Sequence, residues 1–378
     1  MIAKKTFVFF SPYLGHSGSE VLLCNLINEI SKIDEFEIVL VGFTDGDLVT
    51  HLNTNITYFS FTQFYRKYHS FNKRIQRKLF SGNKHNCQHW FLLKIKHDYP
   101  GATWILNTLN LSNLFEFIQS EKIASYIWIH EMAPQFEWRT IPEIQFLKTV
   151  PEKLICVSEA VASSIRPLGI RGEVKVIYPG IFSEEEITKQ SLKKIKNAGE
   201  SVINIGMSGR VDVNKNSLFF LNFARYLKQE NETRFKLTWL GGDDSNGLLY
   251  YIRTIIKAEG LSSLVEFAGF QKKDYVDSMA NFDVFLLPSY YDSFPLVMLE
   301  ASSLGIPIVG WDSGGIKEFV DDNRIGKILM NNSNEELHLF LKGYINNPHQ
   351  FEPGIIKSRS SFFSKERFIK NFLKVLAE

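Results

Sequence analysis

Short apolar runs alternate along most of the chain with longer stretches in which apolar residues recur at helical spacing. The first run, residues 6–10, is followed by a glycine-containing loop, 14–20, and then by the helical pattern of 21–30. Residues 38–42 form the next apolar run. A strand, a loop, a helix and a strand in this order are the first unit of a doubly wound parallel sheet. The pattern therefore predicts an α/β protein.

The same pattern continues in two series, which predicts two Rossmann-like domains. Strands are expected at 103–106, 124–129, 153–157 and 174–178, and again at 202–207, 235–240, 265–268, 282–288 and 306–310. The polar residues between the two series are typical of a linker, and 378 residues are too many for one core of usual size. We expect an N-terminal domain at 1–182, a linker at 183–200, a C-terminal domain at 201–360, and a C-terminal helix at 361–378 that packs back on the N-terminal domain.

Two carboxylates follow the strand expected at 282–288. Asp292 lies in the loop, and Glu300 lies about two turns into a helix that starts near Pro295, a residue that suits a first helical turn. Ligands bind at the carboxyl ends of strands in open parallel sheets. The alternative is that Asp292 caps the helix and Glu300 is a solvated helix residue.

A second strand end of the same half carries two cations. Arg210 and Lys215 follow the strand 202–207 and precede the helix expected from Ser217. Both can converge where a helix N-terminus already favours an anion, which is the requirement of a diphosphate site. Loop cations can also simply be solvated.

In the N-terminal half, the loop after the first strand places Gly15 and Gly18 before Glu20 in the first helical turn. This loop is either a ligand loop or only a tight turn. His130 ends the strand 124–129 beside Glu131, so it can hydrogen-bond a substrate, act as an acid or base, or serve a structural purpose.

Composition limits the classes of protein that remain. A hydrophobic content of 44%, a charged content of 22% and a net charge of +2 are ordinary for a globular chain. The three cysteines are far apart and suggest neither a disulfide framework nor a zinc site, and no signal peptide or bilayer-spanning run is present, so a cytoplasmic location is expected. Asp243 and Asp244 follow two glycines and indicate a turn rather than a metal site.

The charge is uneven, because residues 48–97 contain no acid. The basic segment, residues 66–96, carries nine Lys and Arg residues interleaved with aromatic side chains. This pattern suits an anionic membrane surface, an anionic acceptor or nucleic acid, or else a solvated face over a normal core.

Taken together, these residues resemble the retaining glycosyltransferases of the family 4 type, which have the GT-B architecture of two Rossmann-like domains facing a cleft. The marks of the resemblance are Ser17-Gly18-Ser19-Glu20, His130-Glu131, Val157-Ser158, Gly209-Arg210 with Lys215, Gly241-Gly242, Pro288-Ser289, the segment from Asp292 to Ala301, and Gly314-Gly315.

The resemblance implies a role for each matching residue. Arg210 and Lys215 would hold the donor's diphosphate beside Gly209, Glu300 the ribose of the nucleotide, and Asp292 the donor sugar. His130 would lie near the transferred sugar. The remaining expected contacts are Ser293 and Pro295 in the donor loop, the backbone N–H groups of Phe294, Leu296 and Val297 around the donor, Gly18 near the phosphate, and Ser17 and Glu20 on the acceptor side.

The chain departs from the family pattern at four positions. Asp292 replaces the usual Glu, Ser293 a smaller residue, Ser17 the first glycine of the loop, and Phe182 a frequent Asp. These changes bear on the choice of sugar more than on the fold.

The expected activity is retaining, metal-independent transfer of a sugar from a nucleotide-diphosphate sugar to a hydroxyl of a saccharide, lipid-linked or protein acceptor, in polysaccharide or glycoconjugate synthesis. No cofactor and no nucleic-acid partner are expected, and the basic segment is a candidate for peripheral contact with an anionic membrane. The alternatives are a nucleotide-sugar epimerase or phosphorylase on the same fold, and an inactive nucleotide-sugar-binding protein.

Overall fold

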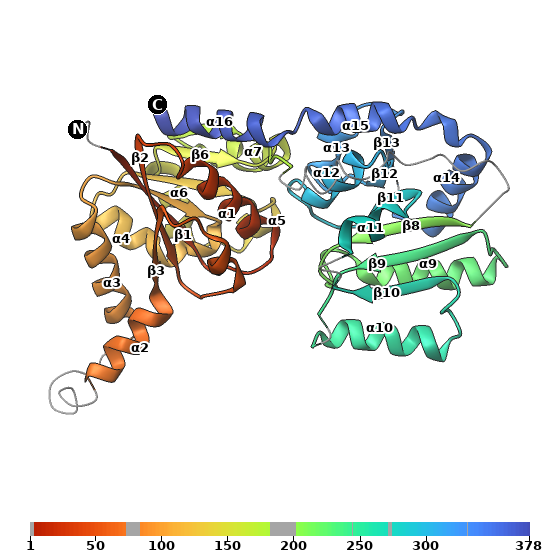
Figure 1. The fold of residues 1–378 in the computed structure, drawn as a ribbon, viewed down its shortest axis with the longest axis horizontal. Coiled ribbons are helices and arrows are strands. Elements are labelled where there is room, and N and C mark those ends of the chain that lie inside the picture. The colour runs from red at the N-terminus through yellow and green to blue at the C-terminus, as the bar shows by residue number, and fades with distance from the viewer. Residues whose placement is uncertain (1–3, 73–83, 182–201, 244, 271–273, 331) are drawn as a thin grey trace. The chain divides into compact units, whose positions relative to one another are not determined.

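The computed structural model describes residues 4–72, 84–181, 202–243, 245–270, 274–330 and 332–378. The expected linker at 183–200, Phe182, Asp244 and residues 73–83 of the basic segment lie outside the described residues. The chain divides into two compact units, Met1–Tyr178 with Ile369–Glu378 and Pro179–Phe368. Each unit is a parallel sheet with helices on its faces (Figure 1).

The N-terminal unit contains a seven-stranded sheet in the order β3-β2-β1-β4-β5-β6-β7, in which all pairs are parallel. Its strands are β1 Lys5–Ser11, β2 Phe36–Gly42, β3 Ile56–Ser60, β4 Thr103–Asn107, β5 Ser125–Ile129, β6 Lys153–Cys156 and β7 Glu173–Val176. Its helices are α1 Gly18–Ile30, α2 Phe61–Asn72, α3 Lys84–Asp98, α4 Phe115–Ser120, α5 Pro134–Glu137, α6 Ile141–Thr149 and α7 Glu159–Ile165, with short 3-10 turns at Asp47–His51, Leu109–Leu114 and Arg166–Leu168.

The C-terminal unit contains a six-stranded parallel sheet in the order β10-β9-β8-β11-β12-β13. Its strands are β8 Ile203–Ser208, β9 Phe235–Leu240, β10 Val265–Gly269, β11 Val284–Leu287, β12 Ile308–Trp311 and β13 Gly326–Leu329. Its helices are α9 Ser217–Gln229, α10 Gly247–Ala258, α11 Tyr275–Ala280, α12 Leu296–Ser303, α13 Ile316–Phe319, α14 Asn334–Asn346 and α15 Pro353–Ser361, with a 3-10 turn at Pro348–Gln350.

The central strands of both sheets are the apolar runs of the sequence, because a strand covered on both faces has no polar side. Phe7, Val8, Phe9 and Phe10 of β1 have no exposed surface, and in the C-terminal unit β8 and β9 pack against α9, α10 and α14 in one core. The predicted doubly wound α/β class is confirmed. The sequence analysis missed β3 and β13, which are edge strands whose inner residues are partly exposed, so neither has a continuous apolar run.

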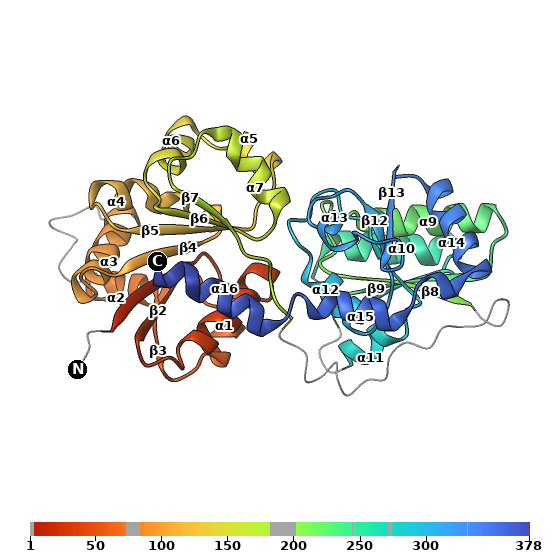
Figure 2. The ribbon, with the colours of Figure 1, turned by 90° about the horizontal axis from the view of Figure 1, so that it is seen from above.

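The last helix, α16 Lys365–Ala377, lies along the N-terminal sheet in both views (Figures 1 and 2). Phe372 is fully buried, with its ring 4.9 Å from that of Trp128 on β5. The ammonium groups of Lys5 and Lys153 donate to the carbonyl oxygens of Leu376 and Val375 at 2.5 Å and 2.8 Å. The last residues of the chain therefore complete the N-terminal core.

Replacing Phe372 with alanine should destabilise the N-terminal unit by about 3–5 kcal/mol, because it leaves a cavity against Trp128. Lys374→Ala changes an exposed residue of the same helix and is the control. The midpoint of thermal unfolding of both variants, followed by calorimetry, measures the difference. Equal midpoints for the two variants would show that the helix adds nothing to the core.

Candidate functional site

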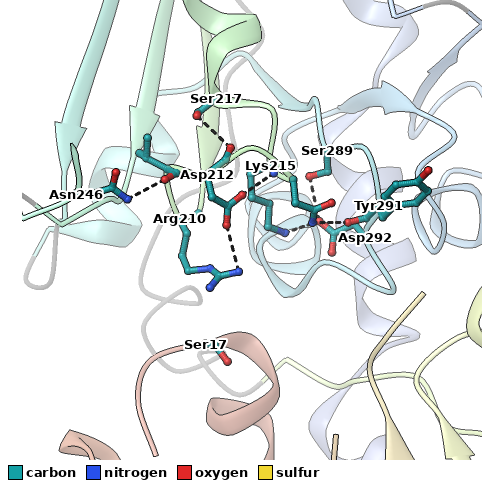
Figure 3. Close-up of polar contacts among 12 residues, drawn as sticks. Ser17, Arg210, Asp212, Lys215, Ser217, Asn246, Ser289, Tyr291 and Asp292 are labelled. Atoms are coloured by element: carbon teal, nitrogen blue, oxygen red, sulfur yellow. Dashed lines mark hydrogen bonds and ion pairs between the residues drawn. The ribbon is translucent and has the colours of Figure 1, made fainter. Parts of the chain in front are cut away.

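Two loops of the C-terminal unit meet because the strands that precede them are neighbours. Strand β11 pairs directly with β8, so the loop after β8 and the loop after β11 leave the sheet side by side. Lys215 from the first loop and Asp292 from the second form an ion pair, with Nζ 2.5 Å from Oδ2 (Figure 3). Their side chains are 20% and 11% exposed, so the pair is largely shielded from water.

Asp292 is held from several sides, and none of its contacts is a helix cap. The Ser289 hydroxyl donates to its Oδ2 at 3.2 Å. The Asp292 N–H donates to the Ser313 carbonyl at 2.7 Å, and its own carbonyl accepts from the Gly315 N–H at 3.0 Å, which joins the loop to the one after β12. Helix α12 begins at Leu296 with Pro295 at the N-cap position and without a side-chain cap. The capping alternative for Asp292 is therefore wrong, and Pro295 precedes the helix instead of lying in its first turn.

Asp212 organises the loop that carries the two cations. Its carboxylate accepts the Lys215 N–H at 2.7 Å and pairs with Arg210 at 3.2 Å, while its carbonyl accepts the Ser217 hydroxyl at 3.1 Å. Figure 3 shows Arg210 directed to Asp212 and Lys215 directed to Asp292. The Arg210 side chain is 74% exposed. The two cations thus contact different carboxylates, and their joint binding of an anion remains a prediction. The sequence analysis missed Asp212, although it lies between them in the sequence.

Glu300 is not a freely solvated helix residue. The Tyr275 hydroxyl, from the first residue of α11, donates to Glu300 Oε2 at 2.7 Å. Burial, reinforced by the Glu300 charge, raises the pKa of Tyr275 well above its usual value, so the phenol stays a donor. The carboxylate of Glu300 is therefore oriented from α12 by a neighbouring helix. Tyr275 could not be identified from the sequence, because α11 precedes β11 and carries no motif.

Glycines allow the strand ends of β8 and β9 to approach closely. A Cβ on Gly241 would lie 2.4 Å from the Gly209 carbonyl oxygen, and Gly241 has φ +112°. The same carbonyl accepts the Trp239 indole N–H at 3.0 Å. Only glycine fits at position 241, so the backbone beside Gly209 and Arg210 is held in place.

The remaining expected donor residues surround the start of α12. Leu296 and Val297 are its first two residues, so their N–H groups have no partner within the helix. Phe294 is buried, and its ring lies 5.2 Å from that of Phe363. The carbonyl of Ser293 lies 2.3 Å from the place of a Cβ on Gly315, so this loop and the loop after β12 are in close backbone contact.

In the N-terminal unit, the glycine loop leads directly into α1. The helix begins at Gly18, and Ser17 occupies the N-cap position without a side-chain cap. The hydroxyls of Ser17 and Ser19 lie 3.2 Å apart, and Ser19 donates to Glu20 Oε2 at 3.1 Å. Glu20 is only 6% exposed. The loop is therefore a polar network and more than a bare turn.

His130 lies at the carboxyl end of β5, next to the end of β4. Its Nε2 is 2.8 Å from Asn107 Oδ1, and desolvation lowers its pKa to about 3. Its neighbour Glu131 accepts the backbone N–H groups of Leu109 and His130 at 2.8 Å and 3.0 Å, yet desolvation still raises its pKa to about 7. Thr108, between these segments, has φ +89°, a strained value for a residue with a side chain.

Two features are absent from the part of the chain that the structure describes. The described residues contain no group of three or more His, Cys, Asp or Glu side chains placed to hold a metal ion. No helix among them is long and apolar enough to cross a bilayer. Asp243 accepts the Ser245 N–H at 2.8 Å, a contact typical of a turn.

Part of the chain matches a known protein family. Residues 203–340 match the family model described as glycosyl transferases group 1. This segment contains Arg210, Lys215, Asp292 and Glu300.

Curated relatives match over varying lengths. The putative colanic acid biosynthesis glycosyltransferase WcaL of Escherichia coli is 26% identical over 50% of this chain and 47% of WcaL. The putative glycosyltransferase EpsF of Bacillus subtilis is 38% identical over 31% of this chain and 29% of EpsF. The matches thus span less than half of either relative. An E. coli UDP-Gal:alpha-D-GlcNAc-diphosphoundecaprenol alpha-1,3-galactosyltransferase is 23% identical over 74% of this chain and 73% of that enzyme.

Solved structures resemble the whole chain. HepE of Anabaena, crystallised with UDP and glucose, has a TM-score of 0.75 at 16% identity. The match covers 98% of this chain and 99% of the HepE chain. TarM of S. aureus, in a complex that includes UDP, has a TM-score of 0.72 at 13% identity. The match covers 99% of this chain and 100% of the TarM chain. The two-domain Rossmann-like GT-B fold predicted from the sequence is confirmed.

The buried carboxyl of Glu131 predicts a pH dependence of stability. A carboxyl whose pKa is raised by folding stabilises the folded state fully below its unfolded pKa and loses that contribution as pH rises through the folded value. Relative to Glu131→Gln, the wild type should therefore lose about 1–3 kcal/mol of stability between pH 4.5 and 7. Thermal unfolding over this range measures the difference.

Glu116→Gln removes an exposed carboxyl of the same unit and should follow the wild type. A constant difference between wild type and Glu131→Gln across the whole pH range would contradict the raised pKa.

Proposed function

We propose that this chain is a retaining glycosyltransferase that moves a sugar from a nucleotide-diphosphate sugar to an acceptor hydroxyl without a metal ion. The observation that carries the proposal is the shielded Lys215–Asp292 pair at the carboxyl ends of β8 and β11. It lies within the segment that matches the glycosyl transferases group 1 model. The match to this family model and the chemistry of Lys215 and Asp292 both support sugar transfer.

Sugar transfer needs positive charge at the leaving group. The bond from the anomeric carbon to the β-phosphate oxygen breaks, which leaves negative charge on the diphosphate. Lys215 supplies a compact, shielded ammonium group, and the exposed guanidinium of Arg210 can turn to grip two phosphate oxygens. The N–H groups at the start of α12, which have no partner within the helix, add donors. These groups together do what a divalent cation would otherwise do, and they support metal independence.

The Lys215–Asp292 pair suggests how donor binding starts. When a diphosphate takes the ammonium group of Lys215, the Asp292 carboxylate loses its cation and is available for sugar hydroxyls. Asp292 is one methylene shorter than glutamate, and the Ser289 hydroxyl and the loop after β12 hold it near the ends of β8 and β11. Glu300, oriented by Tyr275, is the acceptor for the ribose hydroxyls.

We propose that the configuration at the anomeric carbon is retained because the acceptor attacks the same face of the sugar that the phosphate leaves. The acceptor oxygen bonds to the anomeric carbon on the side from which the β-phosphate leaves, and the acceptor's proton passes to a departing phosphate oxygen. A covalent route would need a carboxylate about 5 Å from its partner carboxyl, beneath the anomeric carbon. In the donor-bound state Asp292 is assigned to sugar hydroxyls and keeps its contact with the Ser289 hydroxyl, so we prefer the front-face route.

The names of the relatives support a narrower substrate class. UDP is present in the HepE and TarM complexes, and the E. coli galactosyltransferase is named for a UDP sugar and a diphosphoundecaprenol acceptor. We propose a UDP-sugar donor and a saccharide or lipid-linked acceptor in cell-surface polysaccharide synthesis. Activity at the inner face of the membrane is also consistent with the three buried cysteines, which form no disulfide, because thiols stay reduced on the cytoplasmic side.

The basic segment is proposed to contact an anionic membrane surface. In its described part, Arg66 and Lys67 on α2 are exposed, and Trp90 on α3 is 60% exposed. Exposed cations and an exposed aromatic ring on two helices that contact each other suit a headgroup layer.

Lys215→Ala should lower transfer by about 10²–10³-fold, because the leaving group loses its shielded cation. Transfer from UDP sugars is measured with EDTA present, and folding is checked by thermal unfolding. Lys236→Ala removes another ion-paired lysine, 3.3 Å from Glu266 and on β9, and is the control.

Near-normal transfer by a folded Lys215→Ala variant would contradict the assigned role, and a strict metal requirement would contradict metal independence. Conversion of the nucleotide sugar without an acceptor, or only with inorganic phosphate, would instead indicate an epimerase or a phosphorylase. Binding without any turnover would indicate an inactive binding protein.

Neutralising Arg74, Arg77 and Lys78 with glutamine should weaken binding to vesicles containing phosphatidylserine by about tenfold or more, since each cation near such a surface contributes about 1 kcal/mol. Cosedimentation at low and high salt measures the loss. A variant with the exposed Lys257, Lys327 and Lys370 changed to glutamine loses the same charge and should bind like wild type. Equal loss in both variants would show that only net charge matters.

A further inference from the structure

Asn107 connects three segments at the carboxyl edge of the N-terminal sheet. It is the last residue of β4, and its side chain is fully buried. Its Nδ2 donates to the backbone carbonyl of Ser19 in α1 at 3.3 Å, and its Oδ1 lies 2.8 Å from Nε2 of His130, which follows β5. A buried amide with two defined partners has a defined orientation.

These partners determine which nitrogen of His130 carries hydrogen. A carbonyl oxygen only accepts, so the NH₂ group of Asn107 must face Ser19. Its Oδ1 then faces the imidazole, and because that oxygen also only accepts, Nε2 of His130 must be the donor. A neutral imidazole has one N–H, which leaves Nδ1 with a lone pair.

The surroundings favour the neutral ring. Burial lowers the pKa of His130, and the adjacent Glu131 carboxyl is directed to the backbone N–H groups of Leu109 and His130. Glu131 also interacts with the charge of Arg139. The Trp128 ring lies 4.9 Å from the imidazole. Among the described residues, no hydrogen-bond donor reaches Nδ1.

We propose that Asn107 is a positioning residue that holds His130 as the neutral Nε2–H tautomer and presents Nδ1 as a hydrogen-bond acceptor. The group that binds there must donate, so it is a hydroxyl and not an unprotonated phosphate oxygen. Only the identification of that hydroxyl with a sugar or an acceptor rests on the proposed function. The tautomer itself does not depend on it.

The test is a two-bond ¹H–¹⁵N spectrum of the full chain labelled with [¹⁵N]histidine, with a His130→Asn variant to assign the signal. We expect one protonated nitrogen, Nε2, and one unprotonated nitrogen, Nδ1, unchanged between pH 8 and pH 5. A ring that is charged in this range, or that carries its hydrogen on Nδ1, would overturn the proposal.

Two substitutions separate positioning from packing. Asn107→Asp places a carboxylate against Nε2 and should raise the pH at which His130 becomes charged by about 1–2 units. Asn107→Leu keeps the volume without an acceptor and should give a mixture of the two tautomers. Asn110→Asp adds the same charge at an exposed position of the following turn and should change neither signal.

In a folded Asn107→Asp variant, an unchanged pH of charging of His130, followed below pH 5, would also overturn the proposal. In a folded Asn107→Leu variant, an unchanged single tautomer would do the same. If the wild-type signal is as expected but no sugar transfer is found, the proposed function fails and the role of Asn107 stands.

Discussion

Parallel pairing of neighbouring strands is the constraint on which both units depend. Strands that run in the same direction release their following loops at one edge, so residues distant in sequence meet there. Lys215 and Asp292 are 77 positions apart and form an ion pair because β8 and β11 are adjacent. Asn107 and His130 meet in the same way at the ends of β4 and β5. The order of the strands in each sheet therefore decides which candidate site residues meet.

Much of this arrangement can be predicted from the sequence, for a physical reason. A strand covered on both faces must be apolar throughout, so runs such as residues 6–10 and 235–240 identify the central strands. Polar residues directly after such a run lie at the functional edge. That rule selected His130, Arg210 and Asp292 without knowledge of their partners.

The partners themselves could not be predicted, since they depend on which strands and helices are neighbours. Tyr275 is an ordinary helix residue until α11 places its hydroxyl on Glu300, and Asn107 is one of many strand-end residues until β5 brings His130 to it. Of these partners, Asp212 could most easily have been predicted, because an acid between two cations of one loop is a natural counter-ion. Strands β3 and β13 were missed because their inner residues are partly exposed, so neither shows a continuous apolar run.

Lys215 and Arg210 are paired with the protein's own carboxylates, Asp292 and Asp212. We therefore infer that a ligand must replace Asp292 at Lys215. The most direct test is calorimetric titration of UDP and other nucleoside diphosphates in EDTA into the wild type, Lys215→Ala and Asp292→Asn. We expect Lys215→Ala to lose at least about tenfold in affinity, the effect of about 1.4 kcal/mol, and Asp292→Asn to bind as tightly as wild type or more tightly. Equal affinity of wild type and Lys215→Ala for every diphosphate would contradict a diphosphate site at this pair.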